Sequence, residues 1–354
     1  MYFKAVILHC HQKMQKERSI SGTYYLLQGK PSIQTIQDGQ IYQLNQYFGL
    51  YKKLPKQRFF QIVQNLVEQR LLEKQNQENF YVVTNLGERF ITNYFLESNY
   101  LQGDKFHHMD ELFFQRILLF VQVFTNSKMN NMKFIPIIEN REVKIWLKPY
   151  YKKWKHKSDE ILKTFYDEII RLLTPIENIY AEIFVEQLTG YKRFGLTIEQ
   201  IAHQYQLSVE SVYLLHINTI HYILQTLENE QSQYPLLYCL SKDLLQQGSY
   251  TNSAKITKSL IDSGLTLQEI ARKRRLRLNT IYDHVVEIAL KERDFQISKF
   301  VTKEAVNEIV QAIQALQSYK LKDIKNAVRD EISYFQIRLV LAKFNQIMKE
   351  SESS

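Results

Sequence analysis

Two clusters of basic side chains are the clearest candidates for a functional site in this chain. The segment 272–277 reads Arg-Lys-Arg-Arg-Leu-Arg, and the segment 141–157 holds seven Lys and Arg residues against one Glu. Together the two segments carry a charge of +11, whereas the whole chain carries +9, so the remaining residues sum to −2. Positive charge concentrated in this way favours a polyanionic partner, and duplex or branched DNA is the partner that we expect.

The segment 272–277 is followed by polar residues suited to contacts with DNA. Its basic side chains would bind phosphates, and the residues at the start of the next helix would approach the bases. The candidate DNA-binding residues are Arg272, Lys273, Arg275, Arg277, Asn279, Thr280 and Tyr282. Arg274 is left out, because it occupies a position where an apolar residue is usual, and we expect its stem to be packed.

The second basic cluster alternates lysines with aromatic residues. Its candidate contacts to the DNA backbone are Lys148, Lys152, Lys153, Lys155 and Lys157. An exposed aromatic ring here could stack on a base. The alternative is that Tyr150 and Trp154 belong to the core while the lysines face solvent. We favour this alternative for the rings, because Trp154 lies on the apolar side of a predicted helix.

The chain lacks the motifs expected of an enzyme or a metalloprotein. No P-loop occurs, since Gly22 and the Gly29-Lys30 pair are too far apart and Pro31 follows the lysine. The segment His9-Cys10-His11 has no partner cluster at ligand spacing. His284 is expected to face the core. We therefore expect no catalytic residue, no metal, no cofactor, no small-molecule substrate and no ATP hydrolysis.

The composition predicts an all-α protein. Glycine and proline number only 10 and 6 among 354 residues, too few for the turns of a sheet-rich chain, while apolar residues make up 45%. No apolar run approaches the ~18–20 residues that span a membrane, and the N-terminus lacks the pattern of a signal peptide. The two cysteines show no metal or disulfide spacing. We expect a cytoplasmic protein without a membrane contact.

An internal repeat predicts two helix-turn-helix modules. The segment 195–202, Gly-Leu-Thr-Ile-Glu-Gln-Ile-Ala, recurs 69 residues later as 264–271, Gly-Leu-Thr-Leu-Gln-Glu-Ile-Ala. Each copy starts with a capping box, has a small Ala where a second helix crosses, and has a Leu after the turn. Gln206 and Arg275 stand where glycine is usual in the turn, and a left-handed backbone there costs about 1–2 kcal/mol.

The surfaces of the two copies differ. The second copy carries the basic cluster at its turn, whereas the equivalent surface of the first copy is nearly neutral and includes Glu210. The second copy therefore has the chemistry for phosphate contacts. We expect the first copy to serve in packing, within the chain or with a partner protein.

The coarse pattern predicts four consecutive domains. Residues 1–100 are winged-helix-like, with a helix after Pro55 and a small β-ribbon near residues 80–84. Residues 101–189 are connecting helices, and one of them runs from Trp154 between Pro149 and Pro175. The remaining two domains are the first helix-turn-helix at 190–232 and the C-terminal helix-turn-helix domain at 233–354.

The C-terminal motifs carry a resemblance to a known domain. The segments Ser263–Thr266, Glu269–Ala271, Thr280–His284, Phe300–Thr302, Ile332–Tyr334 and Ile337–Leu339 resemble the helicase-associated helix-turn-helix domain of some RecQ-type helicases. The whole chain resembles the YpbB family of low-GC Gram-positive bacteria, and Gly29–Asp38 is similar to the N-terminal signature of that family. The resemblance implies that a domain fused to the motor in some helicases is here on a separate chain, and that a RecQ-like helicase is its partner.

Three functional hypotheses follow. The first is a non-enzymatic, DNA-binding accessory protein of a RecQ-like helicase, with a role in DNA repair or recombination. The second is a transcription regulator that reads an operator through the same motif, although the sequence shows no evident dimerisation heptad. The third is a protein-interaction scaffold whose charge only aids solubility.

Overall fold

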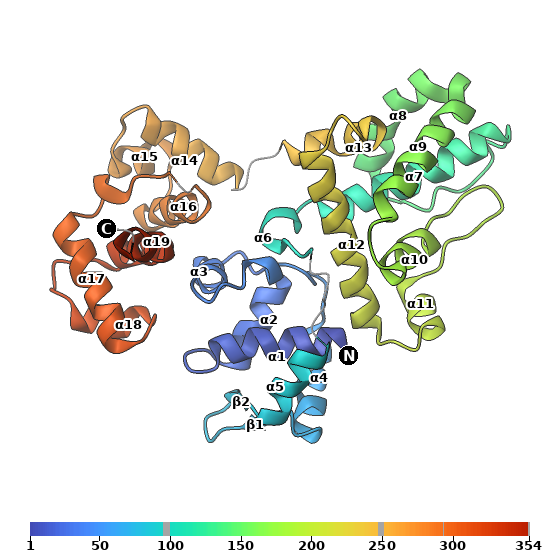
Figure 1. Ribbon diagram of the computed structural model, residues 1–354. Coiled ribbons are helices and arrows are strands. Elements are labelled where there is room, and N and C mark those ends of the chain that lie inside the picture. Colours follow the sequence, from blue (N-terminus) through green and yellow to red (C-terminus); the bar gives the residue numbers. More distant parts are fainter. Residues whose placement is uncertain (95–99, 247–250, 293, 353–354) are drawn as a thin grey trace. The chain divides into compact units, whose positions relative to one another are not determined.

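The computed structural model describes residues 1–94, 100–246, 251–292 and 294–352. These residues are mostly helical, and their only sheet is a two-stranded antiparallel ribbon (Figure 1). The all-α class predicted from the composition is confirmed. A search of these described residues finds no helix with both the length and the hydropathy of a membrane span.

Contacts divide the chain into two compact units, and each unit combines segments that are far apart in the sequence. The first unit comprises residues 1–9 and 85–247, and the second comprises residues 10–84 and 248–354. The sequence pattern led instead to four consecutive domains, because periodicity along the chain does not show which distant segments share a core. That four-part division stays a prediction.

The first unit is built around one long helix. Its elements are the start of α1 (Tyr2–Met14), α5 (Asn85–Tyr94), α6 (Gly103–Phe106), α7 (Asp110–Lys128), α8 (Arg141–Trp154), η2 (Lys155–Lys157), α9 (Ser158–Leu173), α10 (Asn178–Glu186), α11 (Ile198–Gln204), α12 (Val209–Asn229) and α13 (Pro235–Leu245). Helix α12 packs against α7, α10, α11 and α13. Its side chains from Glu210 to Leu224 are all buried except Tyr213 and Tyr222, which are half-buried.

The predicted helix starting at Trp154 is wrong in its N-terminal boundary. Helix α8 runs through Pro149 and ends at Trp154, and α9 begins at Ser158 after the short turn η2. Pro149 leaves the carbonyl of Ile145 without a helical donor. Both residues are exposed, so solvent can reach that carbonyl and the proline does not have to end the helix.

The second unit combines an N-terminal segment with the C-terminal helices. Its elements are the end of α1, α2 (Ile20–Gln28), α3 (Ile33–Ile41), η1 (Asn45–Tyr47), α4 (Lys56–Glu68), β1 (Leu72–Lys74), β2 (Tyr81–Val83), α14 (Asn252–Asp262), α15 (Leu267–Arg274), α16 (Leu278–Lys291), η3 (Ile297–Lys299), α17 (Lys303–Leu316), α18 (Leu321–Ala327) and α19 (Tyr334–Glu352).

The β-ribbon contains the strand expected near residues 80–84 and a partner strand that the sequence pattern did not predict. Strand β2 pairs with β1 so that Leu72 lies opposite Val83 and Lys74 opposite Tyr81. The sequence pattern did not predict β1, because a three-residue strand is too short to show alternation. The interpretation of this region as winged-helix-like stays a prediction.

Helix α3 belongs to the core of the C-terminal helices. Ile41 shares one hydrophobic cluster with residues of α14 to α19. The side-chain amides of Gln37 and Gln40 donate to the backbone carbonyls of Arg338 (3.0 Å) and Ala342 (3.1 Å) on α19. These polar contacts fix the register of α3 on α19. The N-terminal signature segment therefore folds as part of the C-terminal helix-turn-helix unit.

Candidate nucleic-acid interface

Helices α15 and α16 form the helix-turn-helix that the repeat predicts. Thr266 and Glu269 make a complete capping box at the start of α15, in which each side chain bonds the backbone of the other residue. Arg275 takes a left-handed conformation (φ 54°, ψ 41°) that ends α15, and Gln206 does the same in the first copy (φ 55°). The predicted left-handed turn without glycine is therefore confirmed in both copies.

Four basic side chains at this turn are exposed and available. Arg272, Lys273, Arg275 and Arg277, here called the basic turn, form no hydrogen bond or ion pair through their side chains with the part of the chain that the structure describes. The nearby carboxylate of Glu269 is engaged in the capping box. Hydrogen bonds from Thr266 lower the pKa of this carboxyl group, which keeps it ionised and held by the helix N-terminus. The basic turn thus offers positive charge to an external ligand.

The side chain of Arg274 packs against α14, as the sequence pattern predicted. Its guanidinium donates to the backbone carbonyl of Ser253 (2.7 Å), to the hydroxyl of Ser253 (2.8 Å) and to the hydroxyl of Thr257 on α14. His284 lies beside it, with Nδ1 2.9 Å from the Thr257 hydroxyl. Burial and the charge of Arg274 lower the pKa of His284, which favours the neutral ring. The expectation that His284 faces the core is confirmed.

Only the N-terminal end of α16 is open to a ligand. Asn279 is exposed and Thr280 is half-buried, but the ring of Tyr282 stacks on Phe335 with centroids 4.1 Å apart. Asp283 is paired with Arg338 on α19 at 2.6 Å. The helix is then buried from His284 to Ala289, because α3, α14, α15 and α19 all pack against it (Figure 1).

This burial decides how the module can approach DNA. A recognition helix lies in the major groove and contacts base edges through its N-terminal residues. Here Phe335 and Arg338 contact the second turn of α16, and the sequence did not predict these two contacts. The basic turn and the first turn of α16 can therefore reach phosphates and a few base edges from the end of the helix. Beyond its second turn, α16 is buried from His284 to Ala289 and cannot contact base edges.

The first helix-turn-helix is built into the interior of its unit. Its second helix, α12, is buried along most of its length, and the hydroxyl of Ser211 accepts a hydrogen bond from the backbone N–H of Phe3 (3.4 Å). The Tyr205 hydroxyl donates to Glu182 on α10 at 2.7 Å. A helix enclosed in this way cannot enter a groove. The geometry agrees with the packing role expected for the first copy.

The second basic cluster lies on the surface of the first unit. Lys148, Lys152, Lys153, Lys155 and Lys157 are all exposed, and Lys157 pairs with Glu160 at 3.4 Å. The aromatic rings between them pack half-buried instead, with Trp154 centred 5.2 Å from Tyr150 and 6.3 Å from Phe124. The preference for packed rings and solvated lysines is therefore confirmed.

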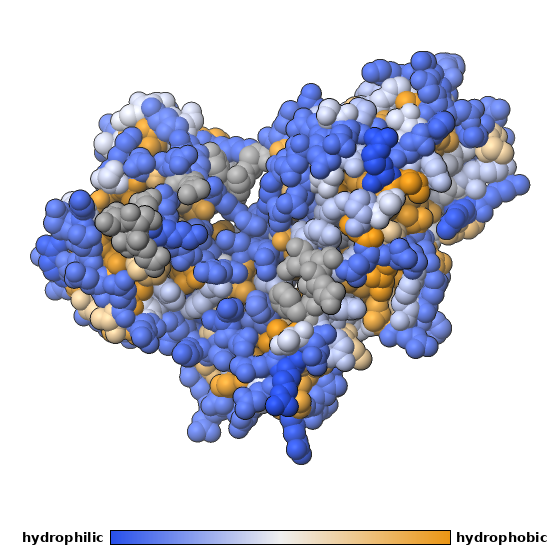
Figure 2. Space-filling view, viewed as in Figure 1, coloured by the Kyte–Doolittle hydropathy of each residue, from blue (hydrophilic) through white to orange (hydrophobic). Residues whose placement is uncertain are grey.

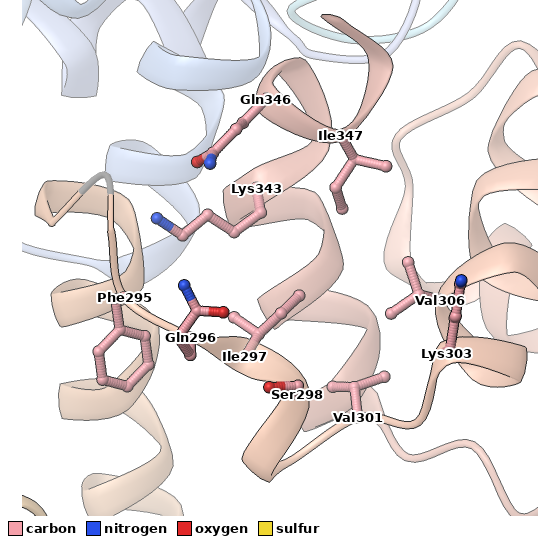
Figure 3. Close-up of a pocket in the computed structure, with 10 residues that line it drawn as sticks. All are labelled: Phe295, Gln296, Ile297, Ser298, Val301, Lys303, Val306, Lys343, Gln346 and Ile347. Carbon is pink, nitrogen blue, oxygen red and sulfur yellow. The ribbon is translucent and has the colours of Figure 1, made fainter. Parts of the chain in front are cut away.

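A cavity of about 340 Å³ in the second unit lies between α19, the segment around η3 and the start of α17 (Figure 3). Its described lining residues are Phe295, Gln296, Ile297, Ser298, Val301, Lys303, Val306, Lys343, Gln346 and Ile347. The ammonium of Lys343 donates to the carbonyl of Glu292, the residue that ends α16. The buried charge of Lys343 is thus used to stabilise the C-terminal end of α16, the end opposite to the basic turn.

The wider surface offers few other candidates. Hydrophilic side chains cover most of the face shown in Figure 2. A search of the described residues finds no group of three or more His, Cys, Asp or Glu side chains that could hold a metal ion. His11 is fully buried, with Nε2 2.9 Å from the carbonyl of Tyr81, and burial lowers its pKa to about 4.

The fold and the site together define an all-α protein that carries a helix-turn-helix domain with an exposed basic turn. A family model described as a helix-turn-helix domain matches residues 253–341, which extend from α14 to α19. The chain is also similar to the protein YpbB of Bacillus subtilis (strain 168), with 30% identity over 346 residues that cover 97% of each chain. The chain belongs to the YpbB family. No solved structure matches it.

Proposed function

We propose that this chain is a cytoplasmic, non-enzymatic DNA-binding accessory protein that works with a RecQ-like helicase in DNA repair or recombination. One observation carries the DNA-binding part of the proposal. The basic turn presents four exposed cations, without ion pairs to other described residues, at the N-terminal end of the second helix of a helix-turn-helix. Phosphates are the ligands that such an arrangement attracts.

The burial of α16 favours recognition of DNA structure over recognition of a base sequence. Phosphate contacts carry no sequence information by themselves, and the second turn of α16 is occupied by Phe335 and Arg338. A regulator that reads an operator would need several side chains along the helix to reach base edges. The accessory role therefore accounts for the geometry better than the regulator does.

The helicase partner rests on the resemblance of the C-terminal motifs to a domain that some RecQ-type helicases carry. The chain has no P-loop, so it would depend on another chain for a motor. The interior position of the first helix-turn-helix leaves the docking of the helicase to other surfaces of the chain.

A charge-matched pair of variants tests the DNA-binding proposal. The first variant replaces the four residues of the basic turn with Ala. The control replaces four exposed lysines elsewhere in the same unit with Ala, namely Lys299, Lys303, Lys320 and Lys322. Binding to duplex, forked and single-stranded DNA is measured by fluorescence anisotropy over a range of salt concentrations.

We expect the basic-turn variant to bind duplex and forked DNA about 10-fold or more weakly, with a log–log salt slope reduced by about 3. The control loses the same net charge and should keep most of its affinity. Equal losses in both variants would show that the basic turn has no special role. Tight binding to one sequence would favour the regulator, and no binding to any DNA would favour the scaffold.

A second experiment tests the accessory role. The purified chain is expected to neither hydrolyse ATP nor unwind a forked duplex, but to bind a purified RecQ-like helicase and raise its unwinding rate. The basic-turn variant should still bind the helicase while stimulating it less. ATPase activity that survives removal of contaminating helicases, or a lack of any complex with the helicase, would contradict the proposal.

A further inference from the structure

The segment between α10 and α11 carries an aromatic ring that almost nothing covers. Phe194 is 86% exposed, and it follows two exposed basic residues, Lys192 and Arg193. Figure 1 shows this segment as a loop that projects from the helices of the first unit. A single exposed apolar side chain is common on protein surfaces, so the geometry of the loop and the charges beside the ring decide whether Phe194 serves in binding.

The loop that holds Phe194 is fixed by hydrogen bonds. Gly190 and Arg193 exchange two backbone hydrogen bonds, of 2.9 and 3.2 Å, which close a tight turn. The backbone N–H of Tyr191 donates to the hydroxyl of Thr125 on α7 at 3.0 Å. A side chain at Gly195 would place its Cβ 2.1 Å from the carbonyl oxygen of Gln187, so this position requires glycine. The ring of Phe194 is therefore presented by a rigid turn.

The charges beside the ring indicate the kind of ligand. Among the described residues, neither Lys192 nor Arg193 forms an ion pair. The ammonium of Lys192 lies 5.3 Å from the ring centre of Tyr191, which holds it at the turn. A flat ring flanked by free cations suits a ligand that combines a flat face with negative charge, as an unpaired nucleotide does.

We propose that residues 191–194 form a binding site for single-stranded nucleic acid. Phe194 stacks on an unpaired base, and Lys192 and Arg193 contact the neighbouring phosphates. Paired bases in a duplex have no free face for this ring, so the site distinguishes single strands from duplex DNA. It lies outside the C-terminal helix-turn-helix domain and does not depend on the function proposed for that domain.

The test compares two exposed aromatic rings in the full chain. Phe194→Ala removes the proposed stacking ring, and Phe194→Trp keeps an aromatic ring at the same place. The control, Tyr166→Ala, removes a ring on α9 that is 63% exposed and lies beside the Lys163–Asp167 ion pair. Each protein is titrated against a fluorescent oligothymidylate of about 20 nucleotides. Thermal melting confirms that each variant is folded.

We expect Phe194→Ala to weaken oligothymidylate binding about 5-fold or more, and Phe194→Trp to retain it. Tyr166→Ala should bind as the unmodified chain does. The pair Lys192→Gln and Arg193→Gln should flatten the salt dependence by about 1.4 in log–log slope. Photo-crosslinking to an oligonucleotide with 5-iododeoxyuridine should label the segment 191–194.

Two results would overturn this proposal. One is unchanged oligothymidylate affinity in Phe194→Ala, which would make the loop a site for another ligand, such as a partner protein. The other is an equal loss in Tyr166→Ala, which would show that exposed rings contribute without regard to position. Duplex binding by the basic turn is measured in parallel, so failure of either site can be recognised separately.

Discussion

At the scale of single residues, the basic cluster at 272–277 separates into outward and inward side chains. Arg272, Lys273, Arg275 and Arg277 face solvent, whereas Arg274 turns to α14 and Leu276 is half-buried after the turn. The helical period and the left-handed residue between the helices impose this division. Charge alone therefore does not identify a DNA contact, and neighbouring arginines in one cluster have different tasks.

The first prediction compares Arg274 with Arg272. Arg274→Ala should lower the free energy of unfolding by about 2–3 kcal/mol, because it removes hydrogen bonds from a charged donor to Ser253 and Thr257. Arg272→Ala should leave the stability within ~0.5 kcal/mol and weaken DNA binding. Urea unfolding and DNA titration measure the two effects. The reverse pattern would show that these two roles are assigned incorrectly.

The second prediction concerns the left-handed turn. Arg275→Gly should stabilise the fold by about 0.5–1 kcal/mol, because glycine adopts positive φ without the clash of a Cβ atom. The same variant should bind DNA more weakly, since it loses a cation of the basic turn. The matched change Gln206→Gly in the first copy should raise the melting temperature without altering DNA affinity. A loss of DNA affinity in Gln206→Gly would contradict the separation of the two copies.

At the scale of elements, the two helix-turn-helix modules use the same local signals in different surroundings. Helix α12 is enclosed by the helices of its unit, whereas α16 keeps its first turn open. Helix α3 is part of the surroundings of α16, because it packs on α16 and α19. It precedes α16 by more than 200 residues in the sequence. The availability of a recognition helix is thus set by its neighbours.

The third prediction tests the contribution of α3 to the C-terminal helices. Ile41→Ala should lower the free energy of unfolding by about 2–4 kcal/mol, since Ile41 lies in the shared core. Hydrogen exchange should become faster in α16 and α19. Ile256→Ala, at a side chain that is 53% exposed on α14, is the control and should change little. Unchanged exchange in α16 would mean that α3 does not support the DNA-binding domain.

At the scale of the whole molecule, each compact unit buries a histidine that is kept neutral. His11 lies in the second unit and His216 in the first, and burial lowers the pKa of each ring to about 4. The charge of Asp110 raises the pKa of His216, and the charge of His221 lowers it. Above pH 6.5 the rings are neutral in both folded and unfolded chains, so the two histidines do not lower the free energy of unfolding there.

The fourth prediction is a loss of stability as the pH falls from 6.5 to 4. In this range the unfolded chain binds protons that the folded chain excludes, so each histidine lowers the free energy of unfolding by about 1.4 kcal/mol per pH unit. His216→Gln should make the fall less steep, and adding His11→Asn should reduce it further. His203→Gln serves as the control for loss of an exposed ring. Equal slopes in all proteins would contradict the role of these two rings.

The helical class, the repeat, the capping boxes and the left-handed turns could be predicted from the sequence, because these features depend on neighbours a few residues apart. Helical spacing also predicted the exposed lysines and the packed Trp154. The interior position of α12 and the stacking of Phe335 on Tyr282 became evident from the folded chain alone. The same holds for the placement of α3 and for the exposure of Phe194. These outcomes depend on which distant apolar faces share a core, and periodicity along one chain does not record that choice.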